Sequence, residues 1–303
     1  MASPNFNSRQ DVTPGICETL SPMVRRVVAD NASPYTFTGT ASYIVGHGDV
    51  AIIDPGPDDD SHLAALLAAT GGERITRIVV THTHLDHTGL VPRLAAQTGA
   101  VTFGFGKHGS GAKAMPEIAA IGDTGGDIQF TPMEELEDGA VLEGPDWCLE
   151  AVHTPGHTSN HLCFALDNEE TLFSGDHVMG WSTTMVALPD GHMGDYMASL
   201  RRLQTRKDSV YWPGHGGPVH QPRRFVRALI AHREAREQAF VRRLRAGDRT
   251  VGEIVGSIYS ELEGKLQQAA ALTTLSHLVD LVERGEVIAN GPLGLKTEYR
   301  TAD

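Results

Sequence analysis

Apolar positions in the first 220 residues follow two different spacings. Short runs rich in β-branched and aromatic residues, such as 35–45 and 50–56, predict strands, and the "GHGD" between them predicts a hairpin turn. The run at 61–70 has apolar residues at helical spacing and predicts a helix that begins at Ser61. Both halves of the region interleave such runs, which predicts two sheets in a layered sandwich with helices outside.

The pattern changes after residue 220. Residues 221–247 have helical spacing, two further helical stretches follow, and a Gly-Pro turn near the C-terminus predicts a hairpin. This order is typical of a small winged-helix domain. We therefore expect a large domain at 1–220, with 1–30 as a surface extension, and a helical, winged-helix-like domain at 221–303.

The composition is that of an ordinary globular protein, with 40% hydrophobic and 21% charged residues. We find neither a run of about 18 apolar residues nor a signal-peptide pattern, so we expect a cytoplasmic protein with no membrane partner. The chain has three cysteines and no CxxC spacing, which argues against a disulfide framework or a thiolate metal site.

Charge is distributed unevenly along the chain. The net charge of -13 argues against a protein that binds polyanions over its whole surface. Residues 221–247, however, hold eight arginines and two glutamates, a local charge of +6 that leaves -19 for the remainder. These arginines are either a solvated helix face or a local site for phosphates.

Histidines and aspartates gather at the ends of predicted strands. The set comprises His82, His84, Asp86, His87, His157, Asp176 and His215. Imidazole and carboxylate are ligands that zinc prefers, and about seven of them suffice for two zinc ions that share an oxygen. In extended backbone His82 and His84 point the same way, while Asp86 and His87 follow in a turn and can reach a second metal. The pattern predicts a dinuclear site for two Zn²⁺, and the same ligands also accept iron or manganese.

The motifs "THTHLDH", "PGHT", "SGD" and "PGHG", in this order, resemble those of the metallo-β-lactamase superfamily over roughly residues 35–225. The resemblance implies a four-layer αββα sandwich. It also implies that three histidines hold one zinc, that three further residues hold the other, and that an aspartate bridges them. By this resemblance the first zinc is held by His82, His84 and His157. The second zinc is held by Asp86, His87 and His215, and the bridging aspartate is Asp176.

Two further residues match superfamily positions close to the metals. Asp54 in "IIDPG" matches an early aspartate that would orient a ligand, although an aspartate before Pro-Gly also suits a turn. His161 matches a histidine that is frequent after the PGHT motif, and a purely structural role fits it equally well.

The helical region offers two more candidates. At 100° per residue, Phe225, Leu229, His232 and Arg236 share one face of the predicted helix. His232 and Arg236 would then lie on the packed face and need polar partners there. We therefore expect them to support the metal ligands from behind.

The residues at two positions differ from those typical of other branches of the superfamily. Asp176 stands where class B β-lactamases mostly carry cysteine, and His84 stands where flavodiiron proteins carry glutamate. The segment "PGHG…IAHREARE" and the tail after it resemble the β-lactamase-like protein 2 branch. The resemblance implies either a single-strand RNA endonuclease or a hydrolase of unassigned substrate; glyoxalase II shares the first motif, but its glutathione-binding tail is not found here.

These patterns leave three functions open. A hydrolase that cleaves an ester or thioester of a small molecule fits the acidic chain, with the glycine-rich stretch 104–127 as a lid and Asp86 as ligand and proton acceptor. An endoribonuclease for single-stranded RNA fits the arginine-rich helix. A non-catalytic winged-helix regulator would need no complete metal site. Because Asp280 and Glu283 outnumber Arg284 in 274–285, we expect the C-terminal domain to dock partners or form a homodimer rather than read DNA.

Overall fold

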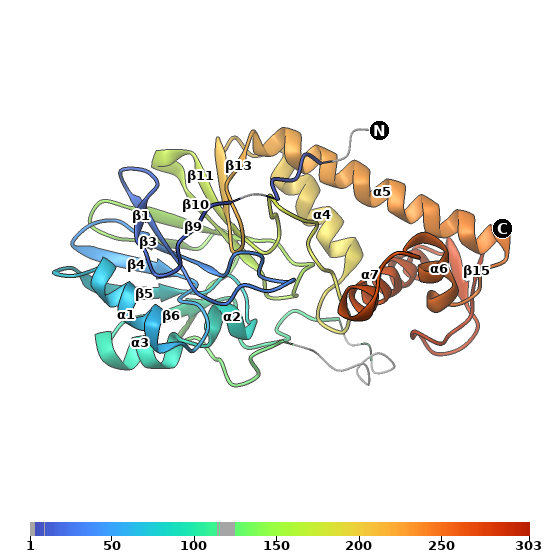
Figure 1. The fold of residues 1–303 in the computed structure, drawn as a ribbon, viewed down its shortest axis with the longest axis horizontal. Coiled ribbons are helices and arrows are strands. Elements are labelled where there is room, and N and C mark those ends of the chain that lie inside the picture. Colours follow the sequence, from blue (N-terminus) through green and yellow to red (C-terminus); the bar gives the residue numbers. More distant parts are fainter. Residues whose placement is uncertain (1–3, 9, 114, 116–124) are drawn as a thin grey trace.

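The computed structural model describes residues 4–8, 10–113, 115 and 125–303. Two β-sheets face each other, helices cover their outer faces, and a helical region lies at one end of the sandwich (Figure 1). Within the predicted lid at 104–127, residues 114 and 116–124 lie outside the described part of the chain. No helix in the described residues is long and apolar enough to cross a membrane.

The first sheet has seven strands in sequence order. They are β1 (Glu18–Thr19), β2 (Val24–Val28), β3 (Ala41–Val45), β4 (Asp49–Ile53), β5 (Arg74–Val79), β6 (Val101–Gly104) and β7 (Glu134–Glu135). Strands β3 and β4 pair antiparallel, which confirms the predicted hairpin, and β4, β5 and β6 run parallel. Helices α1 (Asp60–Ala69) and α3 (Val91–Thr98) cover the outer face, and the short α2 (Leu85–Thr88) follows β5.

The second sheet has six strands, in the order β13, β12, β11, β10, β9, β8. They are β8 (Val141–Glu143), β9 (Cys148–His153), β10 (Leu162–Leu166), β11 (Thr171–Gly175), β12 (Val210–Pro213) and β13 (Val219–His220). A 3-10 turn, η2 (Asp167–Glu169), joins β10 to β11. Helices α4 (Met193–Gln204) and α5 (Pro222–Ala246) cover its outer face.

Three apolar clusters hold these layers together. One fills the space between the sheets, one lies between the first sheet and α1 and α3, and one lies between the second sheet and α4 and α5. Strands β3 and β10 are buried along their whole length because they are covered on both faces. The predicted four-layer αββα sandwich is confirmed.

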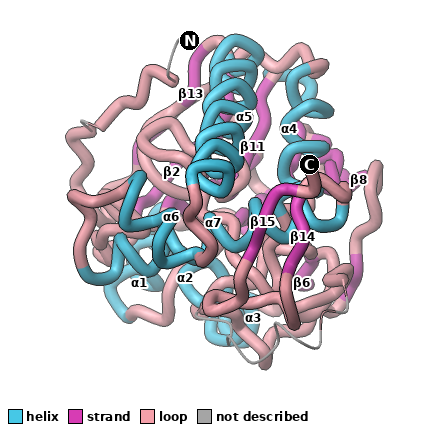
Figure 2. The backbone as a smooth tube through the Cα atoms, turned by 90° about the vertical axis from the view of Figure 1, so that its right-hand side faces the viewer, coloured by secondary structure: helices cyan, strands magenta, loops and turns pink. Residues whose placement is uncertain are grey.

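The C-terminal region contains α6 (Val251–Ile258), α7 (Gly264–Glu283) and a hairpin of β14 (Val287–Ala289) and β15 (Tyr299–Thr301). Figure 2 shows the hairpin at the end of the molecule beside these helices. A fourth apolar cluster fills this region. The helices and hairpin agree with the sequence pattern, whereas the winged-helix assignment and the boundary at 220/221 stay predictions.

Helix α5 takes part in two cores. Val226 and Leu229 pack in the cluster under the second sheet, and Phe240 and Leu244 pack in the C-terminal cluster. One continuous helix therefore joins the sandwich to the C-terminal region.

The first helix begins earlier than predicted. Its N-cap is Asp59, whose Oδ1 accepts a hydrogen bond from the His62 amide at 2.8 Å. Aspartate caps as well as serine does, so the residue two positions before Ser61 satisfies the free amide groups first.

Candidate metal centre

Four loops that follow strands meet at one edge of the sandwich. Residues 81–88 follow β5, His157 lies between β9 and β10, Asp176 follows β11, and His215 follows β12. All seven predicted ligands are brought together here, and their ligand atoms form overlapping groups. The edge at the ends of β5, β11 and β12 thus collects side chains that are far apart in the sequence.

The first group contains His82, His84 and His157. The Nδ1 atom of His84 lies 3.0 Å from Nε2 of His82 and 3.1 Å from Nε2 of His157. Nitrogen ligands at 2.0–2.1 Å around a tetrahedral zinc ion lie about 3.3 Å apart. The spacing of these nitrogens therefore fits one metal ion.

The second group contains Asp86, His87 and His215. Oδ2 of Asp86 lies 3.2 Å from Nε2 of His215 and 3.6 Å from Nε2 of His87. One carboxylate and two imidazoles at this spacing fit a second ion of the same kind.

Asp176 lies between the two groups. Its Oδ2 is 3.6 Å from Nε2 of His157 and 3.3 Å from Nε2 of His215, and its Oδ1 is 3.6 Å from Nε2 of His87. A single carboxylate thus faces ligands of both groups, which is the position that a bridging ligand requires.

The polar atoms of the cluster test whether a metal fits. Nε2 of His87 and Oδ1 of Asp176 are buried and have no hydrogen-bond partner among the described residues. Such atoms are costly to bury unless something pairs with them, so their presence needs an explanation. A cation between them would remove that cost, and the donor set of imidazoles and carboxylates is one that divalent metals take.

The remaining ring nitrogens hold the imidazoles in place. Nδ1 of His157 lies 2.7 Å from the carbonyl oxygen of Met185, and Nδ1 of His215 lies 3.3 Å from that of Gly39. Each Nδ1–H can donate to its carbonyl, which leaves Nε2 as the free ligand atom.

Asp54 supports the cluster from beneath. Its Oδ2 accepts a hydrogen bond from His87 Nδ1 at 2.9 Å, and its Oδ1 accepts one from the Thr81 amide at 2.7 Å. Asp54 is 2% exposed and has a φ of 50°, in the left-handed region that aspartate and asparagine tolerate better than most residues. It therefore contacts a candidate ligand, as the sequence suggested.

His161 also contacts the cluster. Its Nε2 accepts a hydrogen bond from the Asp176 amide at 3.2 Å, and its Nδ1 lies 2.9 Å from Thr154 Oγ1. Burial holds the pKa of His161 well below its usual range, so the ring is neutral and Nε2 is available to accept.

The structure does not bring His232 and Arg236 to the cluster. Arg236 lies over the ring of Tyr259, 4.7 Å from its centre, and His232 is half-buried on α5 without a described contact to a ligand. The most buried face of the helix runs through Val226, Ile230 and Arg233 instead, about one residue away from the predicted face. Arg233 instead donates a hydrogen bond to the carbonyl oxygen of Thr184, in the loop that begins with Asp176. The sequence pattern did not distinguish Arg233 from the other seven arginines of this segment.

The pKa values of His82 and His84 in the first group shift in the opposite direction to those of His87 and His215 in the second. Burial lowers the pKa of His82, and it lowers that of His84 to about 3, so both rings are neutral. Burial also opposes charge on His87 and His215, but the carboxylates around them outweigh it. The pKa of His87 is raised well above its usual range by Asp86, Asp176 and Asp54, and that of His215 is raised to about 9, chiefly by Asp176.

A pocket opens above the cluster, with a volume of about 490 Å³. Candidate ligands form its floor, and its walls come from residues 33–36, Met179, Met185 and α7. The α7 residues in the wall are Gln268, Ala269 and Leu272. The C-terminal region therefore forms part of the site.

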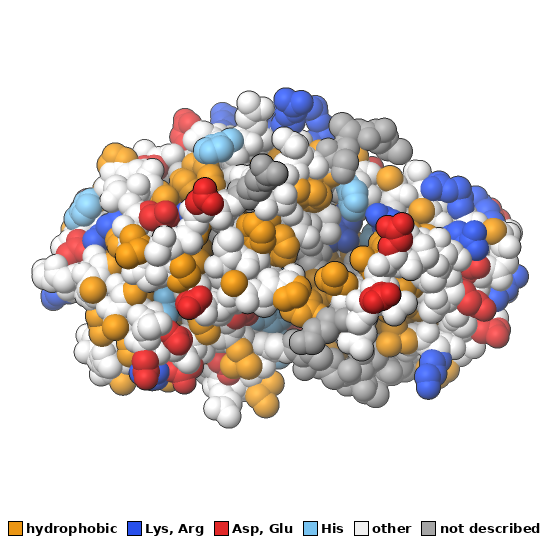
Figure 3. Space-filling view, in the orientation of Figure 1, with side chains coloured by type: hydrophobic (Ala, Val, Ile, Leu, Met, Phe, Trp, Pro, Cys, Tyr) orange, Lys and Arg blue, Asp and Glu red, His pale blue; other side chains and the backbone are white. Residues whose placement is uncertain are grey.

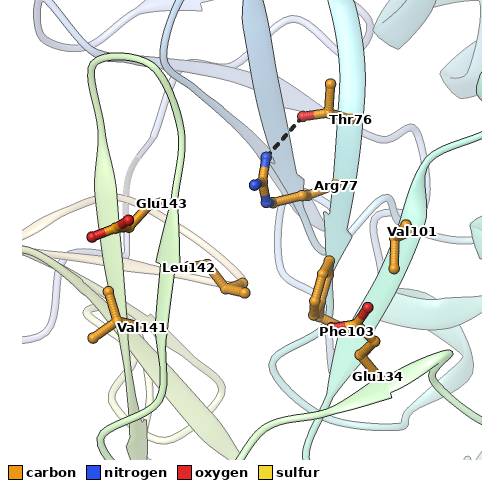
Figure 4. A pocket seen from close by; sticks show the side chains of 8 residues that line it. All are labelled: Thr76, Arg77, Val101, Phe103, Glu134, Val141, Leu142 and Glu143. Atoms are coloured by element: carbon orange, nitrogen blue, oxygen red, sulfur yellow. Dashed lines mark hydrogen bonds between the residues drawn. The ribbon is translucent and has the colours of Figure 1, made fainter.

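A larger cavity lies elsewhere. About 730 Å³ in volume, it opens at a sheet edge between Arg77 and Phe103 of the first sheet and Leu142 of the second (Figure 4). Its eight described lining residues include no histidine or cysteine. Figure 4 shows Arg77 donating a hydrogen bond to Thr76, so it is engaged within its own sheet. The chemistry is concentrated in the smaller pocket.

The sequence profile of the metallo-beta-lactamase superfamily matches residues 35–215, the region that contains every candidate ligand. The chain belongs to this superfamily. The predicted resemblance is thereby confirmed.

Two similar proteins align with most of the chain. A "Beta-lactamase-like protein 2 homolog" of Drosophila melanogaster is 32% identical over 88% of this chain and 90% of its own. An "Atrochrysone carboxyl ACP thioesterase" of Aspergillus fumigatus is 32% identical over 79% of this chain and 71% of its own.

Two solved structures extend the likeness to the C-terminal region. A metallo-beta-lactamase family protein from Thermus thermophilus is 25% identical, with a TM-score of 0.76, over 93% of this chain and 100% of its own. A beta-lactamase domain protein from Burkholderia ambifaria is 22% identical, with a TM-score of 0.79, over 96% of both chains. The latter likeness shows the fold alone.

The charge difference between the two groups predicts proton-coupled metal binding. At pH 7 the raised pKa values keep His87 and His215 protonated, so a metal ion entering their group must displace about two protons. Its apparent affinity should rise with pH up to about 9, whereas the neutral His82 and His84 have no proton to release to an ion in the first group. Calorimetric titration of the metal-free protein in buffers of different ionisation enthalpy measures the released protons. Equal proton release by both metal equivalents would contradict this assignment.

Asp54→Asn should weaken the second group selectively. Asparagine keeps the shape and tolerates the backbone conformation, but it removes the charge that orients the His87 ring. We expect about 10- to 100-fold weaker binding of one metal equivalent, measured by competition with a chromophoric chelator. Asp58→Asn is the matched control, because the Asp58 side chain is 61% exposed and pairs with Arg93 on the surface. Unchanged affinity in Asp54→Asn would show that the hydrogen bond to His87 does not support metal binding.

Proposed function

We propose that this protein is a hydrolase with two metal ions, held by the seven clustered residues, that cleaves the thioester or ester bond of a small molecule with an apolar acyl group. The observation that carries the proposal is the position of the ligand cluster at the floor of an apolar-walled pocket. The pocket volume of about 490 Å³ lies within the usual range for small-molecule sites.

The pocket walls suit an acyl chain. Met179, Met185, Ala269 and Leu272 supply apolar surface, and Ser33 and Thr36 supply a few polar groups. Hydrophobic side chains also gather where the sandwich meets α7 on the face seen in Figure 3. Burial of an apolar acyl group against these walls would place its carbonyl carbon over the cluster.

The ligands and their neighbours would divide the chemistry between them. Two metal ions held by these residues would lower the pKa of a bound water toward about 7 and would stabilise negative charge on the substrate oxygen. The Asp86 side chain is 30% exposed, compared with 9% for Asp176, and it faces the pocket. Burial raises the pKa of Asp86, but His87 and His215 lower it further, so the carboxylate is ionised and can serve as a metal ligand.

The relatives support a thioester more than other bonds. The Aspergillus fumigatus protein named as an ACP thioesterase shares 32% of its aligned residues with this chain, and that alignment covers 79% of the chain. Its name describes cleavage of a thioester, which supports the same reaction for this chain.

The distribution of cations disfavours the endoribonuclease alternative. Among the described residues that line the pocket there is no lysine or arginine. Arginines of α5 that contact their own chain include Arg233, Arg236, Arg243 and Arg245. An RNA backbone needs a continuous cationic path to the metals, which these arginines do not form.

A substrate panel tests the proposal. Metal-loaded protein should release free thiol from acyl thioesters, followed with a thiol-reactive chromophore, and it should prefer longer acyl chains to acetyl. Asp86→Asn should lower kcat by at least about 100-fold, because it removes an ionised ligand of the second group.

Single-stranded RNA with an end label serves as the competing substrate in the same panel. RNA cleavage that Asp86→Asn abolishes, without thioester or ester cleavage, would establish the endoribonuclease instead. Activity that persists in Asp86→Asn would identify a contaminant.

Leu272→Ala tests the role of α7 in the pocket wall. Loss of apolar surface should raise KM for a long acyl thioester about tenfold and leave kcat within about twofold. Gln267→Ala is the matched control, because Gln267 is exposed on the same helix and lies outside the pocket. Equal KM values for the two variants would remove α7 from the substrate site.

A further inference from the structure

We propose that Arg233 is a positioning residue for the metal centre, which it supports from α5 through the loop that follows β11. The inference rests on the proposed metal-dependent function and concerns one step only, namely how the chain holds Asp176 and His157 in place. Arg233 contacts neither residue directly, so it acts through the loop at 176–185.

Arg233 is anchored on two sides. It is 3% exposed, its guanidinium donates a hydrogen bond to the carbonyl oxygen of Thr184, and it lies over the ring of Tyr196 in α4, 5.3 Å from the ring centre. The Tyr196 hydroxyl in turn donates to the carbonyl oxygen of His177 at 3.2 Å. Both contacts reach the segment that begins with Asp176.

The segment held by Arg233 contacts two candidate ligands. The Thr184 hydroxyl donates to the carbonyl oxygen of Asp176 at 2.7 Å. The carbonyl oxygen of the next residue, Met185, lies 2.7 Å from His157 Nδ1, the nitrogen that fixes the orientation of this ring. Movement at Thr184 would therefore shift the carboxylate that lies between the metal groups and rotate an imidazole of the first group.

The choice of arginine is unusual for a position that serves packing alone. No carboxylate in the described part of the chain pairs with Arg233 within 4.0 Å, and its Nε has no hydrogen-bond partner there. A buried cation without a carboxylate is destabilising unless other groups compensate, and an apolar residue of similar size would avoid that cost. A cavity of about 340 Å³ between α4, α5 and α7 borders Arg233 and can supply water to it.

Helix α5, which carries Arg233, also packs in the C-terminal region. The helix continues into the C-terminal cluster through Phe240 and Leu244, two and three turns further on. Support for the metal loop is thus supplied by the helix that also carries the C-terminal region.

Two conservative variants and a control test the proposal. Arg233→Met keeps the length and apolar stem of the side chain, and Thr184→Val keeps its shape and removes only the hydroxyl. Arg236→Met is the matched control, because Arg236 lies one turn along the same helix and contacts Tyr259 rather than the metal loop. All are prepared with two equivalents of zinc, and a second set with Co²⁺.

The readout is metal release to a chromophoric chelator, together with the visible spectrum of the Co²⁺ form. We expect Arg233→Met and Thr184→Val each to release one metal equivalent at least about tenfold faster than the unmodified protein and to change the Co²⁺ spectrum. Arg233→Lys, which can still donate to the carbonyl, should restore part of the retention. The double variant should be no worse than the more severe single variant, because both act through one contact chain.

Other outcomes would overturn the proposal. Normal metal release in Arg233→Met with a lowered melting temperature would show that Arg233 is only structural, and Thr184→Val decides the matter if Arg233→Met does not fold. Equal acceleration in Arg236→Met would assign the effect to α5 in general. If the unmodified protein retains two metal ions but cleaves no thioester or ester, the proposed function is contradicted and this inference still stands. If the unmodified protein takes up no metal, both are overturned.

Discussion

The Asp176 carboxylate is buried between two groups of imidazoles, and the stabilisation of its charge is the constraint that the site depends on. His215 and His87 lie within hydrogen-bonding or ion-pairing range, and the backbone amide of Asp176 donates to His161. Burial raises the pKa of Asp176, but the two histidines hold it well below its usual range. The carboxylate is therefore ionised at neutral pH.

The sandwich provides the rigidity that this arrangement needs. The loops of the site begin at the ends of strands that are hydrogen-bonded to neighbours and covered by helices, so their starting points cannot move independently. Backbone carbonyls fix the orientation of the His157 and His215 rings, and Asp54 fixes that of the His87 ring. The site gains its precision from backbone carbonyls and one buried carboxylate rather than from the ligands alone.

The C-terminal helices complete the site from the other side. Helix α7 forms a wall of the pocket, and α5 sends a buried arginine to the loop that carries Asp176. The described residues that line the pocket include Gln268, Ala269 and Leu272 of α7 and no arginine, so Arg233 lies outside the pocket. The proposed substrate wall and the proposed support of the ligand loop therefore come from different helices.

The sequence alone determined the four-layer fold and the set of residues that meet at the candidate metal centre. Four of the seven, His82, His84, Asp86 and His87, fall within six residues, so their proximity is a local property of the chain, and the strand-end motifs mark the others. Asp54 could be found for the same reason, because its motif ends a predicted strand.

Only the tertiary structure decided which face of α5 is buried, that α7 lines the pocket, and that Arg233 rather than His232 or Arg236 approaches the metal loops. A rotation of about 100° separates adjacent residues on a helix, so an error of one residue in the packed face exchanges one side chain for another. The contacts of Arg233 join α5 to α4 and to the loop at 184, across 49 residues to Thr184. Such contacts depend on how finished elements pack, and no local pattern of residues encodes them.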